Sequence, residues 1–142
     1  MDTKFSVAVH VLILISEAPN QLNSNQIAGS VGTNASYIRK ILSLLKKSGM
    51  IDSHRGVSGY VLTNTPDQIT LLGIYQAVME EAQIHLLDIH QNPNDQCVVG
   101  RHIRPMLAEI FEGIEEAFAQ ELSQKTLADC IEAIRAEMSQ TV

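Results

Sequence analysis

The sequence predicts a mainly α-helical fold with one small β-hairpin, and three observations lead to this class. Apolar residues recur three and four positions apart along most of the 142-residue chain, which is the period of an amphipathic helix. Residues 50–66, "MIDSHRGVSGYVLTNTP", instead place two short apolar runs on either side of "RGVSG", as in a β-hairpin. There is no Trp and only 4% aromatic residues, so we expect an aliphatic core, which suits helices. The length predicts one compact unit, or a small domain with an attached element.

Two helices are predicted before residue 33. Residues 3–17 are apolar nearly all round, and although their β-branched content would also suit a strand, the length favours a buried helix that Pro19 ends. The segment "NSNQIAGSVG" predicts a short second helix, capped by Asn23 or Ser24 and stopped by Gly32.

The third predicted helix lies in "NASYIRKILSLLKKSGMI", residues 34–51, with Asn34 as its N-cap and Gly49 at its C-terminal end. Its buried stripe follows the i, i+3, i+4, i+7 rule and consists of Ile38, Ile41, Leu42 and Leu45. The opposite face carries Ser36, Lys40, Ser43 and Lys47, flanked by Tyr37 and Arg39. With the hairpin and its Arg55, the order of elements predicts a winged helix-turn-helix, whose third helix enters the major groove of DNA.

The second half predicts an elongated helical part. A fourth helix is expected over Leu71–Glu81, followed by a connector with a turn at Asn92-Pro93. A long acidic amphipathic helix, to about Leu122, and a last helix over Leu127–Met138 complete the chain. We therefore divide the chain into a DNA-binding domain, residues 1–82, and a sensor loop with dimerisation helices, residues 83–142. Pro105 either kinks the long helix or separates its first turn.

Charge is distributed unevenly between the two halves. Residues 1–66 carry a formal +3 and residues 67–142 a formal −9, although the whole chain is acidic. Asp52 is the only acid between Glu17 and Asp67, and a surface cleared of carboxylates suits contact with phosphates. Charge alone favours an ordinary solvated lysine face, because such faces are common, so the order of elements is what favours DNA.

Several classes of protein are disfavoured. The apolar run at the N-terminus is too short to span a bilayer and lacks a signal-peptide cleavage site, so we expect a cytoplasmic protein without a membrane partner. Two cysteines 33 positions apart form no disulfide framework. No phosphate loop, nucleophile elbow or zinc-protease motif is present, so we expect no enzyme. The spacing of His85, His90, His102 and Cys97 matches no compact metal site.

The stretch "NASYIRKILSLLKKSGMIDSHRGVSGYVL" resembles the corresponding segment of the IscR-type (Rrf-two) family of bacterial winged-helix transcription regulators. The resemblance rests on the Ser36-Tyr37 pair, the "LLKKSGMI" helix exit and the Arg55-Gly56 wing, and it extends over nearly the whole chain. It implies a ligand-bearing loop, at "NPNDQCVVGRHI", before a dimerisation helix. Cluster-binding members carry three cysteines in that loop, whereas this chain has one, so we expect no iron–sulfur cluster and no other cofactor. The wing also lacks the family's usual glycine run.

The resemblance and the helix geometry together assign site residues. Ser36, Tyr37 and Lys40 stand where the family contacts bases and phosphates, whereas phosphate contacts are expected at Lys46 and Lys47. Arg55 is expected at the minor groove or the backbone. Arg39 ranks lower, because it would also suit an ion pair with an acid elsewhere. The predicted DNA-binding set is Ser36, Tyr37, Arg39, Lys40, Ser43, Lys46, Lys47 and Arg55.

Two readings of Cys97 stay open. If Asp95 caps the long helix, Cys97 falls within its first turn, where backbone N–H groups, helped by Arg101 and His102, favour a reactive thiolate. The other reading is a small apolar residue that docks the loop. Cys130 is expected in the core.

The predicted function is a homodimeric, sequence-specific transcription regulator, a repressor rather than an activator, that binds palindromic double-stranded DNA and senses redox or electrophile stress through Cys97. A winged-helix protein–protein adaptor and a constitutive DNA binder without a sensor are the alternatives. The long helix has more apolar surface than one small domain covers, so the predicted dimer interface is Ile103, Leu107, Ile110, Ile114 and Phe118.

Overall fold

The computed structural model describes residues 2–53 and 59–140, so Arg55 and Gly56 lie outside the described residues. Three helices open the chain: α1 (Lys4–Glu17), α2 (Ser24–Val31) and α3 (Ala35–Lys47). A two-stranded antiparallel hairpin follows, β1 (Ile51–Ser53) and β2 (Tyr60–Leu62). After the short 3-10 helix η1 (Pro66–Gln68) come α4 (Leu71–Met79), α5 (Val98–Ser123) and α6 (Leu127–Ser139). The prediction of a mainly α fold with a hairpin wing is confirmed.

Local signals explain where the early helices begin and end. Asn23 caps α2 in a reciprocal capping box with Gln26, and Gly32 ends the helix at φ +84°. This left-handed residue turns the chain at once into α3, so α2 and α3 pack as a helix-turn-helix pair. Gly49 follows α3 with a left-handed φ of +83°, which turns the chain out of the helix before β1 begins.

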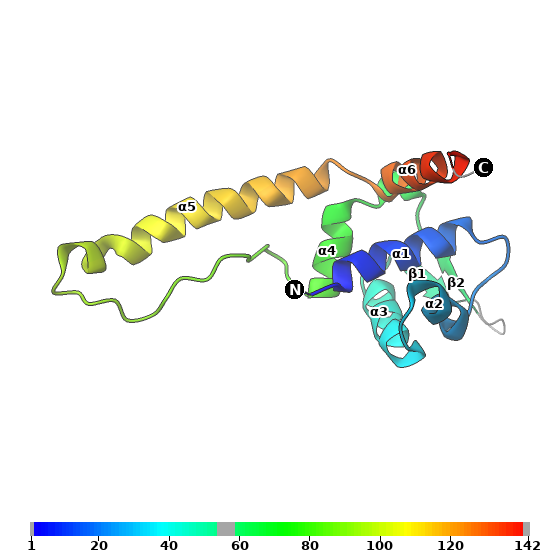
Figure 1. Cartoon of the computed structure of the whole chain (residues 1–142), viewed down its shortest axis with the longest axis horizontal. Coiled ribbons are helices and arrows are strands. Elements are labelled where there is room, and N and C mark those ends of the chain that lie inside the picture. The colour runs from blue at the N-terminus through cyan, green and yellow to red at the C-terminus, as the bar shows by residue number, and fades with distance from the viewer. Residues whose placement is uncertain (1, 54–58, 141–142) are drawn as a thin grey trace.

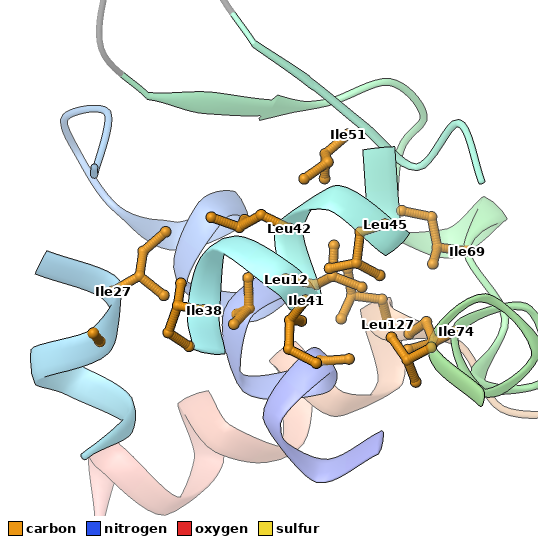
Figure 2. Close-up of a cluster of buried hydrophobic side chains, with 14 of the residues drawn as sticks. Leu12, Ile27, Ile38, Ile41, Leu42, Leu45, Ile51, Ile69, Ile74 and Leu127 are labelled. Atoms are coloured by element: carbon orange, nitrogen blue, oxygen red, sulfur yellow. The ribbon is translucent and has the colours of Figure 1, made fainter. Parts of the chain in front are cut away.

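The core is aliphatic and brings together both ends of the sequence. Figure 2 shows Ile38, Ile41, Leu42 and Leu45 of α3 in one cluster with Leu12 of α1, Ile74 of α4 and Leu127 of α6. Leu127 is fully buried, and Ile131, one turn later, is buried beside it. Backbone hydrogen bonds also fasten this region: Leu71 N donates to Lys125 O (2.9 Å) and Leu127 N to Ile69 O (2.8 Å). Helix α6 therefore packs into the same core as α1, α3 and α4.

An arm projects from this core. Helix α5 extends away from the DNA-binding half, and the connector between α4 and α5 runs back along it (Figure 1). The Glu115 carboxylate accepts hydrogen bonds from Leu86 N and Leu87 N, and the Arg104 guanidinium donates to the carbonyls of Ile89 and His90. These contacts fix the connector on one face of α5, and only Leu122 of that helix is buried.

The start of α5 differs from the prediction. Asp95 does not cap the helix; Cys97 itself is the N-cap residue, without a side-chain capping bond, so it stands one position before the first turn. The chain folds tightly here, because a Cβ on Gly100 would lie 2.1 Å from Asn94 O.

Pro105 lies inside one continuous helix rather than after a separate turn. It stands on the exposed arm, where water can hydrogen-bond the carbonyl that its missing N–H leaves free.

Among the described residues, no helix combines the length and the apolar character needed to cross a bilayer.

Candidate nucleic-acid interface

Helix α3 presents one buried and one exposed face. Asn34 caps it by accepting a hydrogen bond from Tyr37 N (2.8 Å), and Ile38, Ile41, Leu42 and Leu45 anchor it in the core. The opposite side consists of four exposed residues, which we call the groove face: Ser36, Lys40, Ser43 and Lys47. Because these positions lie within about 60° of one another around the helix axis, they can enter a DNA groove together.

Tyr37 occupies a border position. Its side chain is half-buried and packs against the core, although the sequence places it beside the groove face. Only part of its ring is therefore free for DNA.

The remaining cations of α3 contact neighbouring elements. The Arg39 guanidinium lies 3.5 Å from Ser24 Oγ at the start of α2, and among the described residues no acid pairs with it. Lys46 Nζ donates to Ser53 Oγ of β1 at 2.9 Å. The ion pair considered for Arg39 is thus replaced by a contact with a serine.

The groove face has few acids near it. Asp52 is the sole acid between Glu17 and Asp67, and its carboxylate accepts a hydrogen bond from the adjacent Ser53 N (2.8 Å). Because no carboxylate stands on α2 or α3, Lys40 and Lys47 have no acidic neighbour on these helices to neutralise them, and their charge is available to phosphates.

Cys97 is exposed at the N-terminus of α5. The backbone N–H groups of Gly100 and then Val99, at the start of the helix, lower the pKa of the thiol and so favour the thiolate. The expected help from side chains is absent: Arg101 Nε donates to Asp95 O (3.1 Å), and His102 Nδ1 lies 2.8 Å from Val98 O. The half-buried Cys130 behaves oppositely, because burial and then Asp129 raise its pKa.

The histidines considered for a metal site are dispersed. His85 Nε2 lies 2.7 Å from Asp88 Oδ1, and the Asp88 hydrogen bond is the main reason that the pKa of His85 is raised. The described residues hold no group of three His, Cys, Asp or Glu side chains suited to a metal ion.

The apolar surface of α5 differs from the predicted dimer set. Phe118 turns toward the core and stacks edge-on with Tyr75, at 5.7 Å between ring centroids, while Ile103 and Leu107 are half-buried. Ile110 and Ile114 are about half exposed, at 51% and 49%. Three further exposed apolar side chains of α5, Val98, Val99 and Met106, were missed, and the last two continue the stripe. The signal for them was present: positions 99, 103, 106 and 110 are spaced by four, three and four, which is a heptad pattern.

We name this surface the arm stripe, and it consists of Val99, Ile103, Met106, Ile110 and Ile114. Glu115, which faces the connector, lies on a different side of α5, whereas Phe118, four positions after Ile114, adjoins the stripe and turns toward the core.

The sequence matches a known protein family. A family model described as Rrf2, iron-dependent transcriptional regulator, matches residues 1–133. The provisionally named HTH-type transcriptional regulator YwnA of Bacillus subtilis (strain 168) is 40% identical over 129 residues, which cover 91% of this chain and 95% of that protein.

Solved structures show the same fold. A crystal structure described as that of a DNA-binding protein is 37% identical, has a TM-score of 0.74, and the match covers 90% of this chain and 98% of the other. CymR, the global cysteine regulator of B. subtilis, has a TM-score of 0.70 at 23% identity, with 94% and 96% of the two chains covered. IscR of T. potens has a TM-score of 0.69 at 20% identity, with 100% and 91% covered. The winged-helix architecture is thereby confirmed.

The iron-dependent description of the family raises the question whether the thiols here fit an iron–sulfur cluster. Cys97 is the single cysteine of the loop, and Cys130 belongs to α6. The 26-residue helix α5, about 39 Å long, separates the two positions. These residues do not fit a cluster held by several cysteines of one chain.

Proposed function

The chain belongs to the Rrf2 family of transcriptional regulators, and on that premise we propose that it is a homodimeric repressor of a palindromic DNA site. Its relatives are regulators and not enzymes, so its activity is DNA binding. The observation that carries the proposal is the groove face of α3: two lysines and two serines, all exposed, on a capped helix that itself contains no acid. Because DNA is its partner, we place the protein in the cytoplasm.

The groove face divides the work of recognition by residue type. Ser36, near the N-terminus of α3, and the free edge of Tyr37 sample base edges, because that end of a recognition helix enters the major groove first. Lys40 and Lys47 neutralise phosphates. The side chain of Ser43 lies between the two lysines and is suited to either a base or a phosphate.

Salt dependence of binding tests this assignment. The probe is a duplex that the wild-type protein selects from a random-sequence pool. We expect the logarithm of affinity to fall linearly with the logarithm of salt concentration, and Lys40→Glu with Lys47→Glu to abolish binding. A winged-helix domain used as a protein adaptor would lose no nucleic-acid affinity through these changes, and that outcome would overturn the proposal.

The arm stripe supports a dimer. The side chains of Val99, Met106, Ile110 and Ile114 are 44–68% exposed, whereas the other side of α5 is already covered by the connector. A second copy of α5 offers the same stripe, so a two-fold arrangement buries both.

Charge favours antiparallel pairing of the two helices. The first half of α5 carries two bases, Arg101 and Arg104, and one acid, Glu109, whereas the second half carries no base and four acids: Glu112, Glu115, Glu116 and Glu121. Antiparallel pairing sets the basic half of one helix against the acidic half of the other, whereas parallel pairing sets acids against acids. The two-fold axis then presents two recognition helices to two half-sites of a palindrome. A monomer in sedimentation velocity at micromolar concentration would contradict this part.

For the signal, we propose that Cys97 is modified and that no cluster is involved. The lowered pKa and the exposure of the thiol favour attack by the thiolate sulfur on hydrogen peroxide, which gives a sulfenic acid and releases hydroxide. Cys97 stands where the connector meets α5, so its modification can alter the arm and with it the spacing of the two recognition helices.

The decisive measurement is operator affinity of the wild type and of Cys97→Ser, each with and without peroxide. If the wild type responds no more than the variant, Cys97 is structural and the protein is a constitutive binder. Repression is tested separately, by transcription from a promoter that carries the selected site: transcription that rises with added protein would identify an activator.

A further inference from the structure

Lys46 differs from the other lysines of α3 in its direction. It lies about 100° around the helix axis from Lys47, and thus off the groove face. Its amine donates to Ser53 Oγ at 2.9 Å, whereas no hydrogen bond or ion pair is found for Lys40 or Lys47 among the described residues. Adjacent lysines of one helix therefore have different surroundings.

The partner of Lys46 belongs to the hairpin. Ser53 is the last residue of β1 and pairs with Tyr60 of β2. Its own N–H is engaged by the Asp52 carboxylate at 2.8 Å, which holds the local backbone. The contact between Lys46 and Ser53 therefore connects the C-terminal turn of the recognition helix with the outer end of β1.

A second set of contacts connects the hairpin with α3 through its other strand. Thr63, directly after β2, donates from its N–H to Met50 O (3.0 Å) and from its hydroxyl to Gly49 O. Ile51 is buried in the core between these points. The Thr63 contacts hold the base of the hairpin, and the Lys46 contact holds it further out, so that together they define its angle to α3.

We propose that Lys46 is a positioning residue: its amine, bonded to Ser53, sets the orientation of the β1–β2 hairpin relative to the groove face and does not neutralise a phosphate. The inference rests on the proposed groove face, since it separates Lys46 from the lysines that contact DNA. Because the role is one of orientation, Lys46 affects DNA affinity only by way of its hydrogen bond to Ser53.

The test compares single and double variants on the selected duplex at several salt concentrations. Lys46→Met keeps the aliphatic stem of the side chain and removes the donor. We expect it to weaken binding about fivefold, the equivalent of one hydrogen bond, with a salt slope equal to that of Lys4→Met. Lys4 pairs with Asp2 at the start of α1, so Lys4→Met is a charge-matched control away from α3. Ser53→Ala should give the same loss, and the double variant no further loss.

Different outcomes identify different errors. If Lys46→Met reduces the salt slope by about 0.9, as expected for Lys47→Met, then Lys46 contacts a phosphate and the inference fails. Additive losses in the double variant, or unchanged affinity in both single variants, also overturn it. If Lys47→Met leaves the slope unchanged, the groove face itself is wrong. Circular dichroism of each variant confirms that the fold is intact before the affinities are compared.

Discussion

Replacement of Leu127 by alanine should destabilise the DNA-binding core, although Leu127 belongs to the last helix. Its side chain is 0% exposed and packs among residues of α1, α3 and α4. Truncation of a fully buried leucine costs about 2–5 kcal/mol, because transfer energy is lost and a cavity remains. A change of about 3 kcal/mol lowers the melting temperature of a chain of this size by about 10 °C.

The matched control is Ile134→Ala in the same helix. Ile134 is 41% exposed, so its truncation should cost less than about 1 kcal/mol. Both variants are compared with the wild type by urea and thermal unfolding, at one protein concentration because association raises apparent stability. Equal losses in the two variants would refute the conclusion that α6 is anchored in the core by Leu127.

Three further predictions concern the arm. Ile110→Glu with Ile114→Glu should convert the dimer into a folded monomer in sedimentation velocity, because acids then stand in the arm stripe; an unchanged dimer would place the interface elsewhere. Cys97 should react with iodoacetamide faster than Cys130 at neutral pH, and the difference should shrink as the pH rises above the ordinary thiol pKa; mass spectrometry of each peptide measures the two rates, and equal rates at neutral pH would contradict the pKa directions. Two backbone N–H groups of the connector lower the pKa of Glu115, so its stabilising contribution is complete above the ordinary carboxyl pKa and is lost as the pH falls through the lowered value; Glu115→Ala should speed amide exchange in the connector at neutral pH, and unchanged exchange would rule out the clamp.

The DNA-binding half was largely predictable because its signals are local. Asn34, the apolar spacing from Ile38 to Leu45 and the glycine after α3 each specify a helix start, face or end within a few residues. The hairpin followed from two short apolar runs around glycines, and its register pairs Ile51 with Leu62. The order of these elements along the chain predicted the winged helix-turn-helix, and the family resemblance agrees with it.

The surfaces of the arm depended on contacts distant in sequence. Phe118 fits the apolar repeat of α5 as well as Ile114 does. Its ring nevertheless faces the core, because it packs edge-on against Tyr75, which lies 43 positions earlier. Glu115 reads as one more solvent-facing acid, yet it clamps the connector. Periodicity shows that a helix has an apolar side; it does not show which neighbour covers each part of it.

The prediction that Asp95 caps α5 was wrong for a local reason. Asp95 is a common N-cap residue type, and it lies three positions before Val98, the first residue of the helix. The turn formed by Asn94 O and Cys97 N (3.3 Å) occupies those positions instead, and it is compatible only with glycine at position 100.

The return of α6 to the core has a consequence during synthesis of the protein. The ribosome produces α1 to α4 first, but the hydrophobic cluster they share lacks Leu127 and Ile131 until residues 80–126 have been made. A domain that begins to fold on the ribosome therefore cannot complete its interior before the whole of α5 has emerged. A nascent chain whose recognition helix is fully supported is thus one that already carries the arm, and a truncated product without the arm also lacks part of the core beneath that helix.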